Sequence, residues 1–324
     1  MALGEFDLIE RFFRRPVRRA ALGIGDDCAL LAPAAGMQLA VSTDMLVEGR
    51  HFLSTVDPAR LGHKALAVNL SDLAACGARP LAFSLALALP ESNPAFLEPF
   101  ARGLFALADA HDCELIGGDT TRGPLNLCIT VFGEVPNGQA LLRSGARAGD
   151  DIWVSGTLGD ARLALEVFRG RHQLQARTFE AARTRMEQPT PRVALGLALR
   201  GVATSAIDIS DGLLGDLSHV LKASQVGARI DAAAAATLLA TDPADCIGGL
   251  NRAAVLDLVL AGGDDYELAF TAPPAQRDAV AAAAAQAAVR VTRIGCIEAQ
   301  PGVRVVDAQG NALSQRYASF DHFA

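Results

Sequence analysis

Several features that commonly reveal the class of a protein are missing from this 324-residue chain. The longest nearly unbroken apolar run is "LAFSLALAL" at 81–89, whereas a membrane-spanning helix needs about 20 apolar residues. The first ten residues, "MALGEFDLIE", carry acidic residues and no apolar segment with a cleavage site. We therefore expect neither a membrane span nor a signal or transit peptide.

The cysteine and charge content excludes further classes. None of the six cysteines forms a C-x-x-C pair, which argues against a zinc ribbon or a redox motif and suits reduced thiols in a cytoplasm. The net charge of −7 argues against nonspecific binding of nucleic acid. The one basic cluster, "RFFRRPVRRA" at 11–20, is interpreted as a solvated helix end in preference to a nucleic-acid patch. We expect a cytoplasmic protein that binds neither nucleic acid nor a membrane.

Familiar nucleotide-binding and metal-binding motifs are also absent. The sequence has no G-x-x-x-x-G-K-[ST] motif, which excludes a P-loop nucleotide hydrolase. "GIGDDC" at 23–28 begins like the dinucleotide fingerprint G-x-G-x-x-G but has Cys28 where the third glycine belongs. "DISDG" at 208–212 lacks the spacing of an EF-hand, and no set of protein-kinase motifs occurs.

The composition predicts a globular α/β (α+β) protein of two domains. Hydrophobic residues make up 51% of the chain and charged residues 20%, and the length suits two domains of ordinary size. The polar, glycine-containing segment "PNGQALLRSGARAGD" at 136–150 is the candidate boundary. We expect domains at 1–140 and 141–324, and helices alternate with strands in both.

The expected elements follow from apolar periodicity and from the positions of glycine and proline. In the first half we expect helices at 5–14, 63–78 and 94–111, strands at 28–32, 38–43, 79–90, 113–118 and 125–135, a loop at 44–60, and a glycine-rich turn after 118. In the second half we expect helices at 160–169, 171–188, 213–224, 251–260 and 275–287, and strands at 151–156, 205–210, 228–231, 266–271 and 289–297. Within 63–78, Leu66, Leu70 and Leu73 form an apolar stripe that Gly77 closes, and Asp72 lies off this stripe.

Aspartates beside glycine, serine or threonine recur in six short motifs near the expected strands. The motifs are "GIGDDC", "VSTDM", "NLSDL", "GGDTTRG", "DISDG" and "GGDDYE". One such motif alone is explained by an ordinary turn, because Gly and Asp are common turn residues. Six of them favour a functional site, because functional side chains gather on loops at strand ends.

The adjacent carboxylates of Asp26 and Asp27 indicate what such a site would bind. Two unpaired charges about 4 Å apart repel by roughly 4 kcal/mol at an effective dielectric constant near 20. A cation lying between the protein and a polyphosphate would compensate this repulsion. Carboxylates on loops suit Mg²⁺, which leaves positions for phosphate oxygens, and phosphoryl transfer uses such ions to neutralise charge.

Read in order, the motifs closely resemble those of the thiamine-monophosphate kinase family. The resemblance rests on "GIGDDCALL", "STDMLVEGRHF", "HKALAVNLSDLAACGARP", "GGDTTRG", "LLRSGARAGD", "DISDGLLGDL" and "GGDDYELAFT", and it runs from "GEFDLI" to "SFDHF". It implies an aminoimidazole-ribonucleotide-synthetase-like fold with an N-terminal ATP-binding domain and a C-terminal α/β domain. It also implies a homodimer paired through the N-terminal domains, and transfer of the ATP γ-phosphoryl group to thiamine monophosphate, giving thiamine diphosphate and ADP.

The resemblance also implies roles for residues at the matching motif positions. It assigns ligation of several magnesium ions to Asp27, Ser42, Thr43, Asp44, Asp72, Asp119, Asp208 and Asp211. It assigns contacts with ATP to Gly118, Asp119, Arg143 and Ser210, and contacts with thiamine monophosphate to His51, Asp264 and Phe320. These residue types suit the ligands, because a guanidinium offers forked donors to phosphate and a ring face attracts a cationic thiazolium.

One position departs from the family pattern. The family usually reads "GGEDYEL", and here Asp264 stands in place of the glutamate, with a side chain one methylene shorter. For the reaction we expect direct in-line transfer to a phosphate oxygen that is already anionic near neutral pH, so no general base is assigned. Trp153 and Tyr266 are interpreted as packing residues.

Other members of the superfamily, and a non-catalytic protein, are the alternatives. Selenophosphate synthetases use a reactive Cys or selenocysteine with a Lys in an N-terminal segment, and residues 1–25 contain neither Cys nor Lys. The hydrogenase-maturation relative ends in a reactive Cys, whereas this chain ends in "DHFA". Aminoimidazole-ribonucleotide synthetase fits "GGDTTRG" and "STDMLVEGRHF" less well. A cation-binding or nucleotide-binding regulatory module without turnover is the alternative outside the enzymes.

Overall fold

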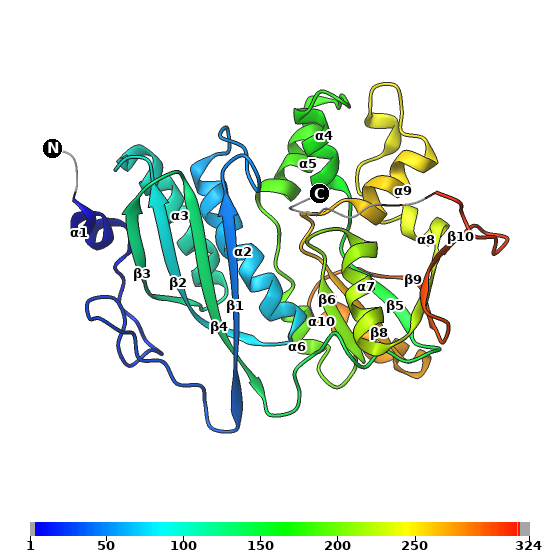
Figure 1. Cartoon of the computed structure of the whole chain (residues 1–324), viewed down its shortest axis with the longest axis horizontal. Helices are drawn as coiled ribbons and strands as arrows, with labels where there is room; N and C mark the ends of the chain where they lie inside the picture. The colour runs from blue at the N-terminus through cyan, green and yellow to red at the C-terminus, as the bar shows by residue number, and fades with distance from the viewer. Residues whose placement is uncertain (1–3, 316, 318–324) are drawn as a thin grey trace. The chain divides into compact units, whose positions relative to one another are not determined.

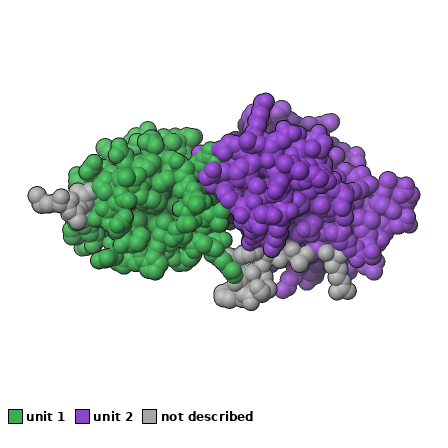
Figure 2. Space-filling model, turned by 90° about the horizontal axis from the view of Figure 1, so that it is seen from above, with its two compact units in different colours: residues 1–73, 78–138 green, residues 74–77, 139–324 purple. Residues whose placement is uncertain are grey.

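The computed structural model describes residues 4–315 and 317, which fall into two compact units. Unit 1 contains the chain up to residue 73 together with 78–138, and unit 2 contains 74–77 together with the chain from 139 (Figure 2). Each unit is built around its own sheet.

Unit 1 has a four-stranded mixed sheet. Its elements are a helical turn α1 (Glu5–Leu8) continued by the π-helical turn η1 (Ile9–Phe13), then β1 (Met37–Val47), α2 (Pro58–Ala75), β2 (Arg79–Leu89), α3 (Pro94–Ala110), β3 (Glu114–Arg122) and β4 (Asn126–Pro136). The strand order is β1-β4-β2-β3, in which only β2 and β3 run parallel. Strands β1 and β3 are therefore the two edges of this sheet.

Helices α2 and α3 lie against one face of this sheet (Figure 1). Leu66, Leu70 and Leu73 of α2 are at most 1% exposed, which confirms the predicted apolar stripe. Asp72 is off the stripe and partly exposed. Gly77 follows the helix with a φ of +65°, a backbone conformation that glycine adopts without strain.

Unit 2 has a six-stranded sheet in the order β10-β7-β9-β5-β8-β6, antiparallel except for the β10–β7 pair. Its strands are β5 (Asp151–Ser155), β6 (Ser205–Asp208), β7 (Gly227–Asp231), β8 (Leu268–Ala272), β9 (Val291–Glu298) and β10 (Gly302–Val306). Its helices are α4 (Asp160–Phe168), α5 (Ala176–Glu187), α6 (Val193–Ala198), α7 (Leu213–Ser224), α8 (Ala232–Ala236), α9 (Arg252–Ala261) and α10 (Arg277–Gln286), with 3-10 turns η2 (Pro243–Asp245) and η3 (Pro274–Gln276). The predicted α/β class is confirmed, with mixed sheets in both units.

Several predicted boundaries are wrong. The strand expected at 28–32 is absent, since Leu30 forms only an isolated bridge with Leu22. Strand β1 continues through residues assigned to a loop, and β3 continues through the turn expected after 118. Consequently Asp44 and Asp119 lie within edge strands of the sheet, whereas the sequence predicted both on loops. The strand expected from Tyr266 begins only at Leu268, and α6, α8 and β10 were missed.

The basic cluster at 11–20 is tied to acidic residues of unit 1. Arg15 pairs with Asp109, and Arg18 and Arg19 pair with Asp112. The buried carboxylate of Glu114 accepts hydrogen bonds from the backbone N–H groups of Arg18 and Arg19 at 2.8 and 3.0 Å. This segment is therefore attached to α3 and β3. Among the helices that the structure describes, none is long and apolar enough to cross a membrane.

Candidate active site

The first group of predicted site residues lies where β1 packs on α2. The Ser42 hydroxyl donates to the Asp72 carboxylate at 2.5 Å, which joins the two elements. The Asp44 backbone N–H donates to the side-chain oxygen of Asn69 at 3.0 Å, and the Asn69 amide donates to the carbonyl of Ala65 at 3.0 Å. Asn69 is 1% exposed and holds the strand at Asp44. Sequence reasoning passed over Asn69, although it stands three residues before Asp72.

Thr43 lies on the opposite face of the same strand. Side chains alternate along a strand, so Thr43 points away from Ser42 and Asp44. Its hydroxyl is 2.9 Å from the hydroxyl of Thr130, its partner on β4. Strand β1 therefore presents predicted ligands on both faces.

His51 stands in the turn that follows β1. Its Nδ1 accepts the backbone N–H of Val47 at 3.0 Å, so the neutral imidazole carries its proton on Nε2. The ammonium group of Lys64 donates to the His51 carbonyl at 3.2 Å, and Lys64 is 2% exposed. A buried cation on α2 therefore fixes the backbone at a predicted substrate-binding residue.

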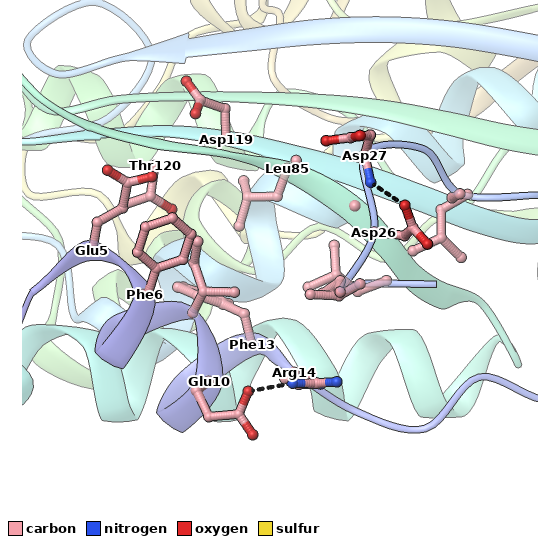
Figure 3. A pocket seen from close by; sticks show the side chains of 18 of the residues that line it. Glu5, Phe6, Glu10, Phe13, Arg14, Asp26, Asp27, Leu85, Asp119 and Thr120 are labelled. Carbon is pink, nitrogen blue, oxygen red and sulfur yellow. Dashed lines mark hydrogen bonds and ion pairs between the residues drawn. The ribbon is translucent and has the colours of Figure 1, made fainter. Parts of the chain in front are cut away.

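A second group lines a groove at the other edge of the sheet (Figure 3). The groove has a volume of about 860 Å³, and its walls come from residues of 5–14, 24–29 and 115–120 together with Leu85. Asp27, Gly118 and Asp119 all lie in it. The Asp27 backbone N–H donates to the Asp26 carboxylate at 2.8 Å, so the first of the paired aspartates has a local role in the turn.

A third group lies on two neighbouring loops of unit 2. Asp208 ends β6, and Ser210 and Asp211 follow in the loop after Ile209. The Asp264 N–H donates to the Ser210 carbonyl at 2.7 Å, and the Tyr266 N–H donates to the Ile209 carbonyl at 2.8 Å. These bonds join the "DISDG" and "GGDDYE" segments, which are 50 residues apart when counted from Gly212 to Gly262.

Asp216 fixes the first of these loops. One oxygen of its carboxylate accepts the backbone N–H groups of Ser210, Asp211 and Gly212 at 3.0, 3.0 and 3.1 Å. The side chain is buried, and burial raises the pKa of Asp216 to about 7 although the three hydrogen bonds act in the opposite direction. The motif "DISDGLLGDL" contained this residue, and sequence reasoning assigned it no role.

The second loop is held by two further buried acids. Glu267 is fully buried between Arg185 and Arg192, whose guanidinium groups donate to it at 2.7 and 2.6 Å. Asp265 is 1% exposed and accepts the Gly159 N–H at 3.0 Å, and its burial raises its pKa. Asp264 and Tyr266 have backbone φ angles of +72° and +52°, which residues other than glycine rarely adopt. Tyr266 is buried, as expected of a packing residue, whereas Asp264 is partly exposed.

Two predicted residues stand apart from these groups. The side chain of Arg143 is exposed, and its carbonyl accepts a hydrogen bond from the Ser224 hydroxyl at 3.2 Å. Phe320 lies outside the described residues.

The oxygen donors of unit 1 suit magnesium, but within one chain they do not lie close together. The donors are carboxylates and hydroxyls, which hard cations prefer. Nevertheless, no three acidic, histidine or cysteine side chains of the described residues lie close enough to hold a metal ion. The reason is the strand order, since Asp44 on β1 and Asp119 on β3 are three strand spacings apart, roughly 14 Å.

Comparison with known proteins defines the class of protein that carries these groups. Residues 25–135 match the family model AIR synthase related protein, N-terminal domain, and residues 147–308 match AIR synthase related protein, C-terminal domain. Because these matches cover most of the chain, the fold is that of the AIR synthase related proteins.

Individual proteins similar to this chain identify the family within this class. The thiamine-monophosphate kinase of Salmonella typhimurium is 47% identical over 330 residues, which cover 100% of this chain and 99% of the relative. The crystal structure of thiamine-monophosphate kinase from Stenotrophomonas maltophilia K279a is 48% identical, has a TM-score of 0.84, and the match covers 97% and 99% of the two chains. A solved complex described as AaThiL with AMPPCP and TMP is 29% identical, with a TM-score of 0.75 and coverage of 90% and 89%. The chain belongs to the thiamine-monophosphate kinase family.

Proposed function

We propose that this protein transfers the γ-phosphoryl group of ATP to thiamine monophosphate and releases thiamine diphosphate and ADP. The observation that carries the proposal is 47% identity to a thiamine-monophosphate kinase over the full length of both chains. The complex of a more distant relative with AMPPCP and TMP supports it, because these ligands match an ATP analogue and the acceptor. The free state of all six cysteines agrees with action in the cytoplasm.

The predicted residues would divide the binding between them. Magnesium would be held by Asp27, Ser42, Thr43, Asp44, Asp72, Asp119, Asp208 and Asp211. ATP would contact Gly118, Asp119, Arg143 and Ser210, and thiamine monophosphate would contact His51, Asp264 and Phe320. Bound magnesium supplies charge neutralisation on the phosphates.

The protein's own contribution to the reaction would be orientation. The attacking atom is a phosphate oxygen of thiamine monophosphate, which is anionic near neutral pH, so direct in-line transfer needs no general base. The Nε2–H of His51 would donate to a phosphate oxygen of the acceptor, and Lys64 keeps the turn that carries His51 in position. The exposed guanidinium of Arg143 would donate to the phosphates of ATP.

The functional form would be a homodimer whose sites combine residues of two chains. Leu39, Val41 and Met45 lie on the face of β1 opposite α2, and they are 44%, 54% and 52% exposed. An exposed apolar sheet face of this kind suits a second copy of the chain. A two-fold axis parallel to the strands would also place the β1 edge of one chain at the β3 edge of the other, and the site that we propose combines Asp44 of one chain with Asp119 of a second chain.

Product formation tests the proposed reaction. Purified protein is incubated with ATP and Mg²⁺ and with either thiamine monophosphate or free thiamine, and an EDTA reaction is the control. We expect thiamine diphosphate and ADP in a one-to-one ratio from the monophosphate alone, and no product with EDTA. Folded protein that binds ATP but forms no thiamine diphosphate would contradict the proposal and favour a superfamily relative or a regulatory module.

A further inference from the structure

A fully buried carboxylate ends the "GGDDYE" segment and accepts hydrogen bonds from three other parts of unit 2. Arg192 binds the Glu267 carboxylate through two atoms, since its Nε donates to Oε2 at 2.6 Å and its Nη2 donates to Oε1. Arg185 of α5 donates to Oε1 at 2.7 Å, and the Ser155 hydroxyl at the end of β5 donates to Oε2 at 2.6 Å. Each carboxylate oxygen therefore has two donors. We call these four residues the Glu267 cluster.

The backbone beside the cluster is shaped to admit this carboxylate. Gly156 has a φ of +55°, and a Cβ there would lie 2.1 Å from Oε1 of Glu267, so a side chain at this position would displace the carboxylate. The Ser155 hydroxyl also accepts the backbone N–H of Leu268 at 2.8 Å. The cluster thus joins the end of β5 and the start of β8 to α5 and to the residue before α6.

The backbone that leads into Glu267 is strained. Asp264 and Tyr266 both have positive φ angles, and residues other than glycine keep such angles only where the surrounding structure enforces them. Hydrogen bonds to the carbonyls of Ser210 and Ile209 hold one side of this segment, and the Glu267 cluster holds its end. Strain of this kind gathers at functional sites, and the segment carries Asp264, a predicted contact of the acceptor.

The use of charge in the cluster also points to a role beyond folding. Well-packed apolar residues in place of a buried ion pair are often as stabilising or more so, whereas the loss of one partner leaves an unpaired buried charge. A guanidinium that binds a carboxylate through two atoms adds a fixed angle between them, which apolar packing does not supply. The cluster is therefore explained by the conformation that it specifies, which is the strained backbone at Asp264.

We propose that Arg192 and Arg185 are positioning residues for the acceptor: through Glu267 they hold the Asp264 carboxylate in the orientation that binds thiamine monophosphate. This inference rests on the proposed function, because it takes Asp264 to contact the acceptor. It gives a role to α5 and to the residue before α6, which none of the predicted site residues includes.

Equilibrium binding tests this role without depending on turnover. Thiamine monophosphate is titrated calorimetrically into protein that holds Mg²⁺ and AMPPCP, well below the melting temperature of each variant. We expect Arg192→Gln to weaken binding of thiamine monophosphate by roughly 10- to 150-fold, the range for loss of one hydrogen bond to a charged group. Arg192→Lys keeps the charge without the two-atom contact and should lose less. The affinity for AMPPCP should stay within a few-fold, because Asp216 holds the Ser210 loop separately.

The ion-pair cluster of Asp151 provides a matched control. Asp151 is the first residue of β5, whereas Ser155 is the last, and the Asp151 side chain is 3% exposed. Arg277 binds its carboxylate through the same two atoms, with Nε at 2.6 Å and Nη2 at 3.0 Å. Arg277→Gln therefore makes the same change at the other end of the strand, and it should leave the affinity for thiamine monophosphate unchanged.

A second variant of the Glu267 cluster covers the case in which Arg192→Gln does not fold. Arg185→Gln removes a single donor from the carboxylate, so we expect a smaller loss of affinity for thiamine monophosphate in the same direction.

The outcomes distinguish this inference from the proposed reaction. Folded Arg192→Gln or Arg185→Gln with wild-type affinity for thiamine monophosphate would overturn the positioning role. An equal loss in Arg277→Gln, or an equal loss for AMPPCP, would also overturn it, because the effect would then be a general loosening of unit 2. Wild-type protein whose affinity for thiamine monophosphate depends on Arg192, but which forms no thiamine diphosphate, would contradict the proposed reaction and leave the positioning role in place.

Discussion

Neighbouring acidic residues of this chain have environments that differ sharply, and their roles differ accordingly. Asp264 is partly exposed, whereas Asp265 beside it is 1% exposed and caps a backbone N–H of another segment. Asp151 is likewise buried and accepts hydrogen bonds from Arg277 at 2.6 Å and from Arg293 at 3.1 Å. Acidic residues in the same short motif can therefore serve folding or function, and only their surroundings separate the two.

Asp151 offers a test at this scale through pH. Hydrogen bonding from Arg277, with help from Arg293, holds the pKa of the Asp151 carboxyl below its usual value although burial opposes this. A carboxyl pKa that is lower in the folded state stabilises the fold at pH values above the unfolded-state pKa of about 3.9. This stabilisation is lost as the pH falls from there through the folded-state pKa. We expect Asp151→Asn to cost about 1–2 kcal/mol at pH 7, since both arginines are half exposed, and the difference should shrink below about pH 4.

Chemical unfolding at several pH values measures this effect. Glu98→Gln on α3 is the control, because it makes the same change of carboxylate to amide at an exposed position. A cost for Asp151→Asn that stays constant from pH 7 to pH 3.5 would show that the ion pairs do not stabilise the fold.

At the scale of elements, α2 and α3 approach each other through glycine. A Cβ at Gly62 would lie 2.0 Å from the carbonyl oxygen of Phe100, and a Cβ at Gly103 would lie 1.8 Å from the carbonyl oxygen of Ala59. Each helix thus presents a glycine to the backbone of the other. This close contact fixes the position of α2, which carries Lys64, Asn69 and Asp72 to β1 and to the His51 turn.

We expect Gly103→Ala to destabilise the protein by about 3 kcal/mol or more, because the added methyl group meets backbone that has no space to move. Thermal unfolding measures the loss. Gly123→Ala is the matched control, because its Cβ would lie 3.6 Å from the Cβ of Ala88, an ordinary contact. Equal melting temperatures of the two variants would contradict the close packing of the helices.

The sequence predicted elements well where a single face is buried and poorly where strands meet loops. The stripe of Leu66, Leu70 and Leu73 marks α2, because a helix packed on one side repeats its apolar residues every three or four positions. The segment "GGDTTR" looks like a turn in composition, yet pairing with β2 keeps it extended as far as Arg122. Local propensity does not reveal this pairing, because the partner strand is distant in sequence.

The same distinction applies to the candidate site. The aspartates were found because they recur beside glycine, serine and threonine in short motifs. Asn69, Asp216 and Glu267 were not found, because their roles arise from hydrogen bonds formed only after folding. Their residue types alone carry no signal of this kind.

At the scale of the whole molecule, the strand order of unit 1 decides how the proposed site is composed. Asp44 and Asp119 belong to opposite edges of one sheet, so within one chain they cannot bind the same ion. The proposed homodimer resolves this separation, since it brings an edge of one sheet to the other edge of its partner. Catalysis would then require two chains.

Complementation between inactive variants tests this composition. Asp44→Asn and Asp119→Asn should each lower turnover by orders of magnitude when both chains carry the change. A heterodimer of the two variants, purified through two different affinity tags, retains one intact site, so about half of the wild-type turnover should return.

A second heterodimer controls for nonspecific recovery. Asp44→Asn paired with Asp72→Asn should stay inactive, because Asp72 of α2 lies against β1, the strand of Asp44, and each site then contains one defect. An inactive heterodimer of Asp44→Asn and Asp119→Asn would show that each site belongs to a single chain.

The burial of Lys64 has a practical consequence for labelling. The chain contains only two lysines, Lys64 and Lys222, and Lys64 is enclosed beneath the His51 turn. Lys222 is exposed near the end of α7, the helix that begins directly after the "DISDG" loop. Apart from the terminal amino group, an amine-reactive fluorophore would therefore attach at one known side chain of the native protein. The chain thus accepts an optical reporter at the far end of the helix that follows the "DISDG" loop, without any engineered cysteine.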